Sequence, residues 1–174
     1  MRLLQLSIAS LVCGLVACDS GGGADSASGQ KHELIGQQAP SFSVNSANGK
    51  GKVDLASLKG KVVIVDFWAT WCGPCKESFP KLQELYSKYQ ASGVEVVGLS
   101  EDDENEGIPE FGQAHGAVKF AIGWDSGKSI AGHYKPPTMP TSFVVDKDGI
   151  VRFVHVGFHD TDTAEIEKEL KTLM

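Results

Sequence analysis

Hydrophobic residues are concentrated in a run from Lys61 to Trp68, in which Val, Ile, Phe and Trp dominate. A β-branched and aromatic run of this kind predicts a buried strand. After a short turn comes the sequence Trp71-Cys72-Gly73-Pro74-Cys75. Beyond it, apolar residues recur every three or four positions, which predicts a helix from about Gly73 to Tyr89. Two cysteines are therefore expected where a helix begins, just past the end of a central strand.

The rest of the chain alternates short strand-like and helix-like stretches. Serines alternate with Phe42 and Val44, which predicts an edge strand or hairpin. Further strands are expected over Val94–Ser100, Phe120–Ile122, Ser142–Asp146 and Val151–Val156. Helices are expected over Ile108–His115, Ser126–Tyr134 and Asp162 to about Thr172. Ser126 is expected to cap its helix, and Asp162 with Glu165 to form a capping box.

Composition and charge bound the number of domains and the kind of partner. The chain has 174 residues, 41% of them hydrophobic, and a formal charge of −6, which suits one domain and disfavours a nucleic-acid partner. The apolar stretch Leu3–Val16 is too short to span a bilayer and predicts a signal-peptide core. Residues 18–35 are mostly Gly, Ser, Ala and polar, which predicts a flexible tether. We therefore expect a leader over 1–17, the tether, and one domain over 36–174.

The four cysteines fall into two groups. Cys13 lies in the expected leader, and Leu15-Val16-Ala17-Cys18 resembles a bacterial lipoprotein cleavage signal. That resemblance implies cleavage before Cys18 and lipidation of its thiol. The alternative is an ordinary secretory signal that is cleaved after Ala17 and leaves Cys18 free. Either reading places the domain outside the cytoplasm, with Cys72 and Cys75 as its internal pair.

The spacing of Cys72 and Cys75 favours redox chemistry over a structural role. A disulfide across so short a loop stabilises little, and a closed zinc site needs two further ligands that no second cysteine pair supplies. Free N–H groups and the helix dipole should let the Cys72 thiolate form at a lower pH than in a free thiol. Cys72 is then the exposed attacking thiol, and Cys75 the resolving thiol. The acidic stretch Glu101–Gly107 is interpreted as a solvated loop, because it lacks the spacing of a calcium-binding EF-hand loop.

Two adjacent motifs resemble a known family. Val65-Asp66-Phe67-Trp68-Ala69 followed by Trp71–Cys75 resembles thioredoxin, and the chain from Gln37 onward is similar to membrane-anchored TlpA/ResA-type thiol–disulfide oxidoreductases. The resemblance implies an α/β thioredoxin fold, with a mixed central sheet and helices on both faces. It also implies an N-terminal extension and a central αβ insertion. No cofactor and no metal are expected.

Asp66 is a candidate acid–base residue. Strand alternation places it on one face with Ile64 and Trp68, and an unpaired carboxylate there should have a raised pKa. It lies six positions before Cys72, where thioredoxin carries its buried acid, so the resemblance implies that Asp66 accepts a proton from Cys75. The alternative is a partly exposed aspartate without a role. Ser78 departs from the pattern, because TlpA/ResA-like proteins commonly carry an acid there.

A second loop is expected to face the cysteines. Met139-Pro140-Thr141 before an apolar strand matches the cis-proline motif of thioredoxin. The resemblance implies a cis Met139–Pro140 bond beside the sulfurs and β-like pairing of the Met139 backbone with a substrate chain. The alternative is a trans proline in a loop. The expected substrate-binding residues are Trp71, Gly73, Pro74, Met139 and Pro140.

The resemblance implies an enzyme that exchanges thiols and disulfides on proteins at the periplasmic face of a bacterial membrane. The Gly-Pro pair between the cysteines favours a reductant, fed by a membrane thiol donor, with apocytochrome c as a candidate substrate. A disulfide oxidase or isomerase is the alternative within the same class. A peroxiredoxin-type peroxidase or a Sco-like copper chaperone are alternatives from other classes.

Overall fold

The computed structural model describes residues 31–116 and 118–174. The strands are β1 Ser43–Asn45, β2 Lys52–Asp54, β3 Val62–Trp68, β4 Val94–Ser100, β5 Ala121–Trp124, β6 Thr141–Val145 and β7 Val151–Val156. The helices are α1 Cys75–Tyr89, α2 Ile108–Ala114, α3 Ser129–Tyr134 and α4 Asp162–Leu173, with 3-10 turns η1 Leu55–Leu58 and η2 Gln90–Ser92. Most of the expected elements are confirmed, with bounds shifted by a few residues.

Five strands form the central sheet, in the order β5-β4-β3-β6-β7. β4 runs parallel to both β3 and β5, whereas β6 runs antiparallel to both β3 and β7. Every residue of β3 is buried, as the apolar run of the sequence predicts. The mixed sheet is thus confirmed, and its central strand points its C-terminal end at the cysteine motif.

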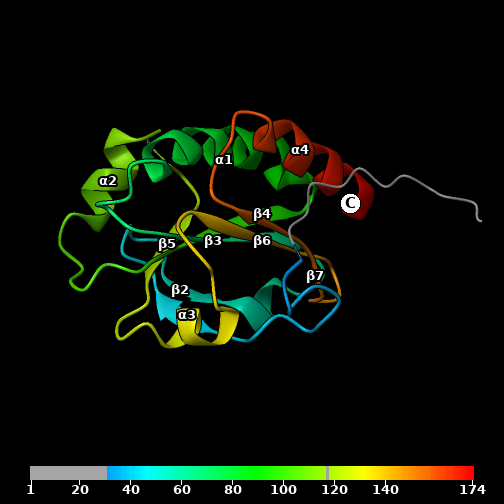
Figure 1. Ribbon diagram of the computed structural model, residues 1–174, viewed down its shortest axis with the longest axis horizontal. Coiled ribbons are helices and arrows are strands. Elements are labelled where there is room, and N and C mark those ends of the chain that lie inside the picture. The colour runs from blue at the N-terminus through cyan, green and yellow to red at the C-terminus, as the bar shows by residue number, and fades with distance from the viewer. Residues whose placement is uncertain (1–30, 117) are drawn as a thin grey trace, which may run out of the picture.

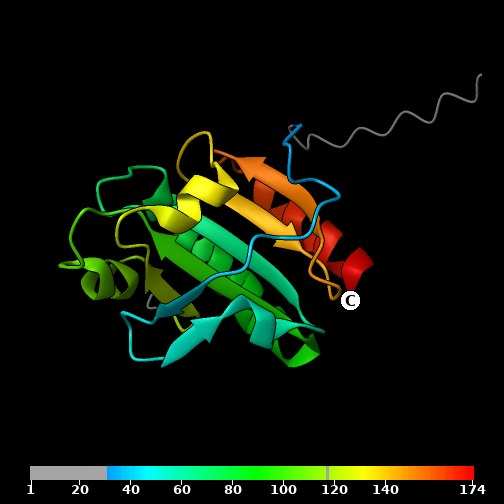
Figure 2. The same ribbon diagram turned by 90° about the horizontal axis from the view of Figure 1, so that it is seen from below.

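Helices cover both faces of this sheet. Figure 1 shows α1 and α4 on one side, and α3 with the β1–β2 hairpin on the other; Figure 2 shows α3 and the hairpin in front of the sheet. Alternate residues of β3 pack into two apolar cores, one on each face of the sheet. Val62, Ile64 and Trp68 pack with α1, α2 and α4, while Val63, Val65 and Phe67 pack with Phe143 and Tyr134. The predicted arrangement of helices on both faces is therefore confirmed.

The N-terminal extension packs against the sheet. β1 and β2 form an antiparallel hairpin, and Ser46, just after β1, forms a β-bridge with Gly123 of β5. Before the hairpin, the His32 ring meets Phe143 edge-on at 5.1 Å, and Leu34 packs on the same core. The folded unit therefore begins a few residues before Gly36.

Three local expectations are wrong. Ser126 does not cap α3: the Asp125 carboxylate accepts hydrogen bonds from the Ile130 and Ala131 N–H groups, at 2.9 and 2.8 Å. Asp162 is not the N-cap of α4: it is the first residue of the helix, Thr161 occupies the cap position, and the Asp162 carboxylate accepts from the N–H of His159. The acidic loop is only partly solvated, since Glu101 and Asp102 are buried.

The expected signal peptide over 1–17, the lipidated Cys18 and most of the tether lie outside the described residues. Within the part of the chain that the structure describes, no helix has the length and apolar character needed to cross a membrane.

Gly123 allows the hairpin to approach β5. A Cβ atom there would lie 2.4 Å from a Val44 methyl and 3.2 Å from Leu99. We therefore expect Gly123→Ala to lower the free energy of unfolding by about 1–3 kcal/mol through overpacking. Gly132→Ala in α3 is the matched control, because nothing lies within 4 Å of its added methyl. Urea unfolding measures both, and equal effects would contradict the close packing described here.

Candidate active site

The two cysteines lie at the connection between the end of β3 and the start of α1. Cys72 and Cys75 form a disulfide, with Cα atoms 5.3 Å apart. Cys75 is the first residue of α1, and its backbone N–H donates to the Cys72 sulfur at 3.2 Å. Cys75 is fully buried and Cys72 is 4% exposed, less than expected for an attacking thiol. The helix start therefore supplies a hydrogen-bond donor to the outer sulfur, which favours its anionic form.

The residues around Cys72 form an exposed rim. Trp71 is 68% exposed, an uncommon position for a large aromatic side chain. Gly73 and Pro74 are also exposed, and nothing lies within 4 Å of a Cβ atom built on Gly73. Pro74 immediately precedes α1, where its missing N–H leaves no helical hydrogen bond unmade. These residues leave room for another chain to reach the Cys72 sulfur.

The turn before Cys72 is fixed by an aspartate that the sequence analysis did not single out. The Asp102 carboxylate accepts from the Thr70 backbone N–H at 3.0 Å and from its hydroxyl at 2.7 Å. The Ser100 hydroxyl also donates to it at 2.7 Å. Asp102 therefore ties the cysteine loop to the end of β4. The sequence analysis missed Asp102 because it lies in the acidic stretch Glu101–Gly107, whose composition is typical of a solvated loop.

The second loop lies where the resemblance implies. The Met139–Pro140 bond is cis, as predicted. Met139 packs against the apolar cluster that contains both cysteines, and Pro140 is buried. The Pro140 carbonyl accepts from the N–H of Gly157 at 2.8 Å, which joins the loop to the end of β7. The structure thus brings Met139 and the cysteine pair into one cluster.

Asp66 is fully buried on the β3 face that α1 covers. Burial raises its pKa to about 7, and a hydrogen bond from Ser142 opposes that rise. One carboxylate oxygen accepts from the Ser142 hydroxyl at 2.6 Å, while the other has no partner among the described residues. The expected raised pKa is therefore confirmed, and Asp66 can exchange a proton near neutral pH.

Glu101 is a third buried carboxylate near the cysteine loop, and the sequence analysis missed it. Burial raises the pKa of Glu101 to about 7, and the neighbouring Asp125 carboxylate adds to the rise. The Glu101 N–H donates to the carbonyl of Trp68, at the end of the central strand, at 2.8 Å. Glu101 lies beside the active-site loop, but in the part of the chain that the structure describes no hydrogen bond or ion pair joins its side chain to the cysteines.

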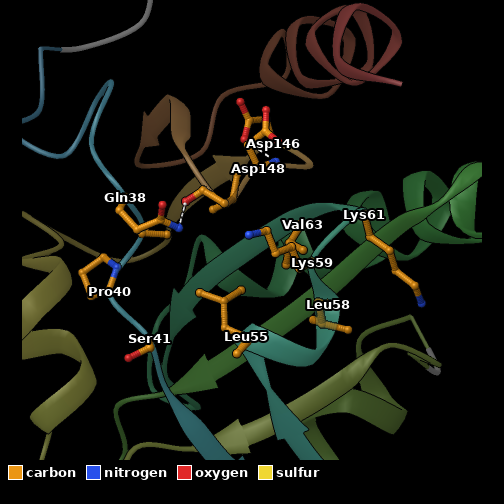
Figure 3. Close-up of a pocket in the computed structure, with 14 residues that line it drawn as sticks. Gln38, Pro40, Ser41, Leu55, Leu58, Lys59, Lys61, Val63, Asp146 and Asp148 are labelled. Carbon is orange, nitrogen blue, oxygen red and sulfur yellow. Dashed lines mark hydrogen bonds between the residues drawn. The ribbon is translucent and has the colours of Figure 1, made fainter.

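Two other features lie away from the cysteines. Among the described residues, ligand atoms of His155, Asp162 and Glu165 lie within 4.8 Å of one another. However, His155 already pairs with Glu169 at 2.8 Å, and the start of α4 disfavours a cation. An open pocket of about 520 Å³ is lined by η1, the start of β3 and the β6–β7 turn (Figure 3). It lies at the opposite end of β3 from the cysteines.

Comparisons with known proteins agree with this geometry. The family model described as AhpC/TSA matches residues 35–154. The chain belongs to the AhpC/TSA family. The chain is also 44% identical over 117 residues to the thiol-disulfide oxidoreductase ResA of Bacillus thuringiensis, a match covering 67% of this chain and 66% of that protein. The chain thus spans just under two thirds of that relative.

Other relatives point the same way. ResA of Bacillus subtilis is 34% identical over 122 residues, which cover 70% of this chain and 67% of that protein. A Chlorobium tepidum crystal structure, assigned as a thiol:disulfide interchange protein DsbE, has a TM-score of 0.74 at 34% identity. That match covers 80% of this chain and 96% of the other. The thioredoxin-like fold and the ResA-like resemblance are therefore confirmed.

The buried Asp66 gives a pH-dependent stability. The native state keeps its proton up to about pH 7, whereas the unfolded state loses it above the ordinary value of 3.8. The free energy of unfolding should therefore fall as pH rises through this window. We expect Asp66→Asn to remove that loss, because asparagine does not titrate. Its free energy of unfolding should exceed that of the wild type by on the order of 4 kcal/mol at pH 8, and the difference should be near zero below pH 4.

Urea unfolding of the disulfide-bonded protein at several pH values measures this difference. Asp148→Asn is the control, because it removes one carboxylate at an exposed position instead of a buried one. An Asp66→Asn gain that is constant from pH 4 to pH 8 would contradict the raised pKa.

Proposed function

We propose that this chain is a thiol–disulfide oxidoreductase that reduces disulfides of protein substrates. The observation that carries the proposal is the Cys72–Cys75 pair at the start of α1, with a backbone donor on the Cys72 sulfur. The exposed Trp71 and the adjacent Met139 loop support a protein rather than a small molecule as substrate. Among the described residues, no hydrogen-bond partner occurs for the Met139 backbone, which suits β-like pairing with a substrate chain.

The reaction starts from the reduced protein. The Cys72 thiolate attacks one sulfur of a substrate disulfide, so that a mixed disulfide forms and one substrate thiolate leaves. Cys75 then gives its proton to Asp66, and its thiolate attacks the Cys72 sulfur. This step breaks the mixed disulfide and releases the second substrate thiolate, which takes up a proton. Two electrons pass to the substrate, and the protein is left with the Cys72–Cys75 disulfide.

The reducing direction rests on Gly73 and Pro74. Thioredoxin carries the same pair and has a reduction potential of about −270 mV. An oxidase or isomerase remains the alternative within the class. Equilibration with glutathione measures the potential, and a value above roughly −180 mV would overturn the reducing direction.

The alternatives from other classes have less support. A peroxiredoxin-type peroxidase needs the pattern Pro-x-x-x-Thr-x-x-Cys, whereas Thr70 and Cys72 are only two positions apart. A Sco-like copper chaperone uses a Cys-x-x-x-Cys pair, one residue longer than the spacing here. The family name alone therefore does not favour a peroxidase.

The place of action and the partners extend the proposal. The signal-like Leu3–Val16, the lipobox-like Leu15–Cys18 and the tether support a domain held outside the cytoplasm by a lipid on Cys18. A membrane thiol donor would re-reduce the disulfide, and apocytochrome c is a candidate substrate. Mass spectrometry of the membrane-bound protein tests the anchor by measuring the mass added to Cys18. An unmodified Cys18 would contradict the proposed lipid anchor.

Trapping tests the activity and names the substrates. Cys75→Ser should accumulate mixed disulfides through Cys72, because the resolving thiolate is missing. Cys72→Ser is the matched control and should trap nothing. Insulin reduction by the wild-type protein with dithiothreitol provides a second readout, which Cys72→Ser should lower to the background rate. Equal trapping by the two variants, or no catalysed insulin reduction by the wild type, would contradict the proposal.

A further inference from the structure

Ser142 lies directly opposite Asp66 in the sheet. The two residues are register partners of β6 and β3, so their side chains point to the same face. Both are buried, and the Ser142 hydroxyl donates to one Asp66 carboxylate oxygen at 2.6 Å. A buried hydroxyl is costly in an apolar strand unless it is hydrogen-bonded. Asp66 provides the acceptor that the buried Ser142 hydroxyl needs.

The hydrogen bond makes the two carboxylate oxygens of Asp66 different from each other. One oxygen is held by Ser142, and the other has no partner among the described residues. The unpartnered oxygen is the one left to receive a proton from α1, which begins with Cys75. A donor on the first oxygen also stabilises the ionised form, which is the form that accepts a proton.

We propose that Ser142 is a positioning residue of the thiol chemistry, whose hydroxyl orients the Asp66 carboxylate and keeps it ionised as the proton acceptor for Cys75. This inference rests on the proposed function for its catalytic consequence. The hydrogen bond itself does not depend on that function.

The other ionisable groups near this pair act on it less directly. On β7, His155 is the register partner of Ser142, but its ring nitrogen is bound to Glu169 of α4 at 2.8 Å. From α1 and α4, Lys81 and Asp162 line a small cavity beside Ser142. None of these groups contributes to the raised pKa of Asp66, which reflects burial opposed by the Ser142 hydroxyl.

The cavity beside Ser142 guides the choice of variants. Its volume is about 10 Å³, enough for at most one water molecule. Ser142→Ala could therefore admit a water that replaces the hydroxyl. Ser142→Val and Ser142→Thr form a better matched pair, because both side chains have the same shape and only Thr keeps the hydroxyl. Both are also well suited to a strand.

Carbon-13 NMR of the Asp66 carboxyl in the disulfide-bonded protein tests the inference without any activity. Hydrogen bonds to charged groups are worth enough to change proton affinity about tenfold or more. We therefore expect the titration midpoint of Ser142→Val to lie at least about one pH unit above that of Ser142→Thr, with Thr near the wild type. Asp66→Asn assigns the signal. Equal midpoints for Val and Thr would overturn the inference.

Kinetics of the reduced protein test the catalytic consequence. With excess Ellman's reagent, Cys72 attack releases the first coloured thiolate and Cys75 attack releases the second. We expect the second step of Ser142→Val to be roughly fivefold slower than that of Ser142→Thr at pH 7, with little difference at pH 9. A Val defect that is the same at both pH values would contradict the role in proton transfer. A shifted NMR midpoint with no insulin reduction by the wild type would instead count against the proposed function alone.

Discussion

The backbone N–H of Cys75 donates to the Cys72 sulfur at 3.2 Å, and the site depends on this contact. Because α1 starts at Cys75, the N–H of Cys75 has no acceptor within the helix and is free to bind the sulfur. Because β3 ends at Trp68, the short turn that follows places the Cys72 sulfur in front of that N–H. The fully buried β3 fixes that strand end at the centre of the sheet. The remaining elements can be understood as support for this junction.

Two buried carboxylates, each with a distinct task, flank the junction. Asp102 holds the turn before Cys72 through both polar groups of Thr70, which makes it structural. Asp66 lies deeper, under α1, where burial brings its pKa to about 7 and makes it able to exchange a proton. A buried carboxylate with a single hydrogen-bond donor can be protonated near neutral pH, because one donor only partly offsets the cost of burying its charge. Ser142 is that single donor.

The local parts of this arrangement could be predicted from the sequence. Periodicity located β3 and α1, strand alternation located the buried Asp66, and the thioredoxin-like motif implied the cis Met139–Pro140 bond. The parts that were missed depend on contacts across the chain. Ser142 lies 76 positions from Asp66, and the burial of Glu101 and Asp102 depends on neighbouring segments rather than on their acidic neighbours. Hydrophobic patterning carries no information about such polar partners.

The central claim is that the start of α1 stabilises the anionic sulfur of Cys72. The most direct measurement is the rate of Cys72 alkylation by iodoacetamide against pH, in the reduced Cys75→Ala variant, where a single thiol of the domain reacts. The account predicts a half-maximal rate more than about one pH unit below the value near 8.5 of a free thiol. A midpoint at or above about 8.5, equal to that of the urea-unfolded protein, would contradict it.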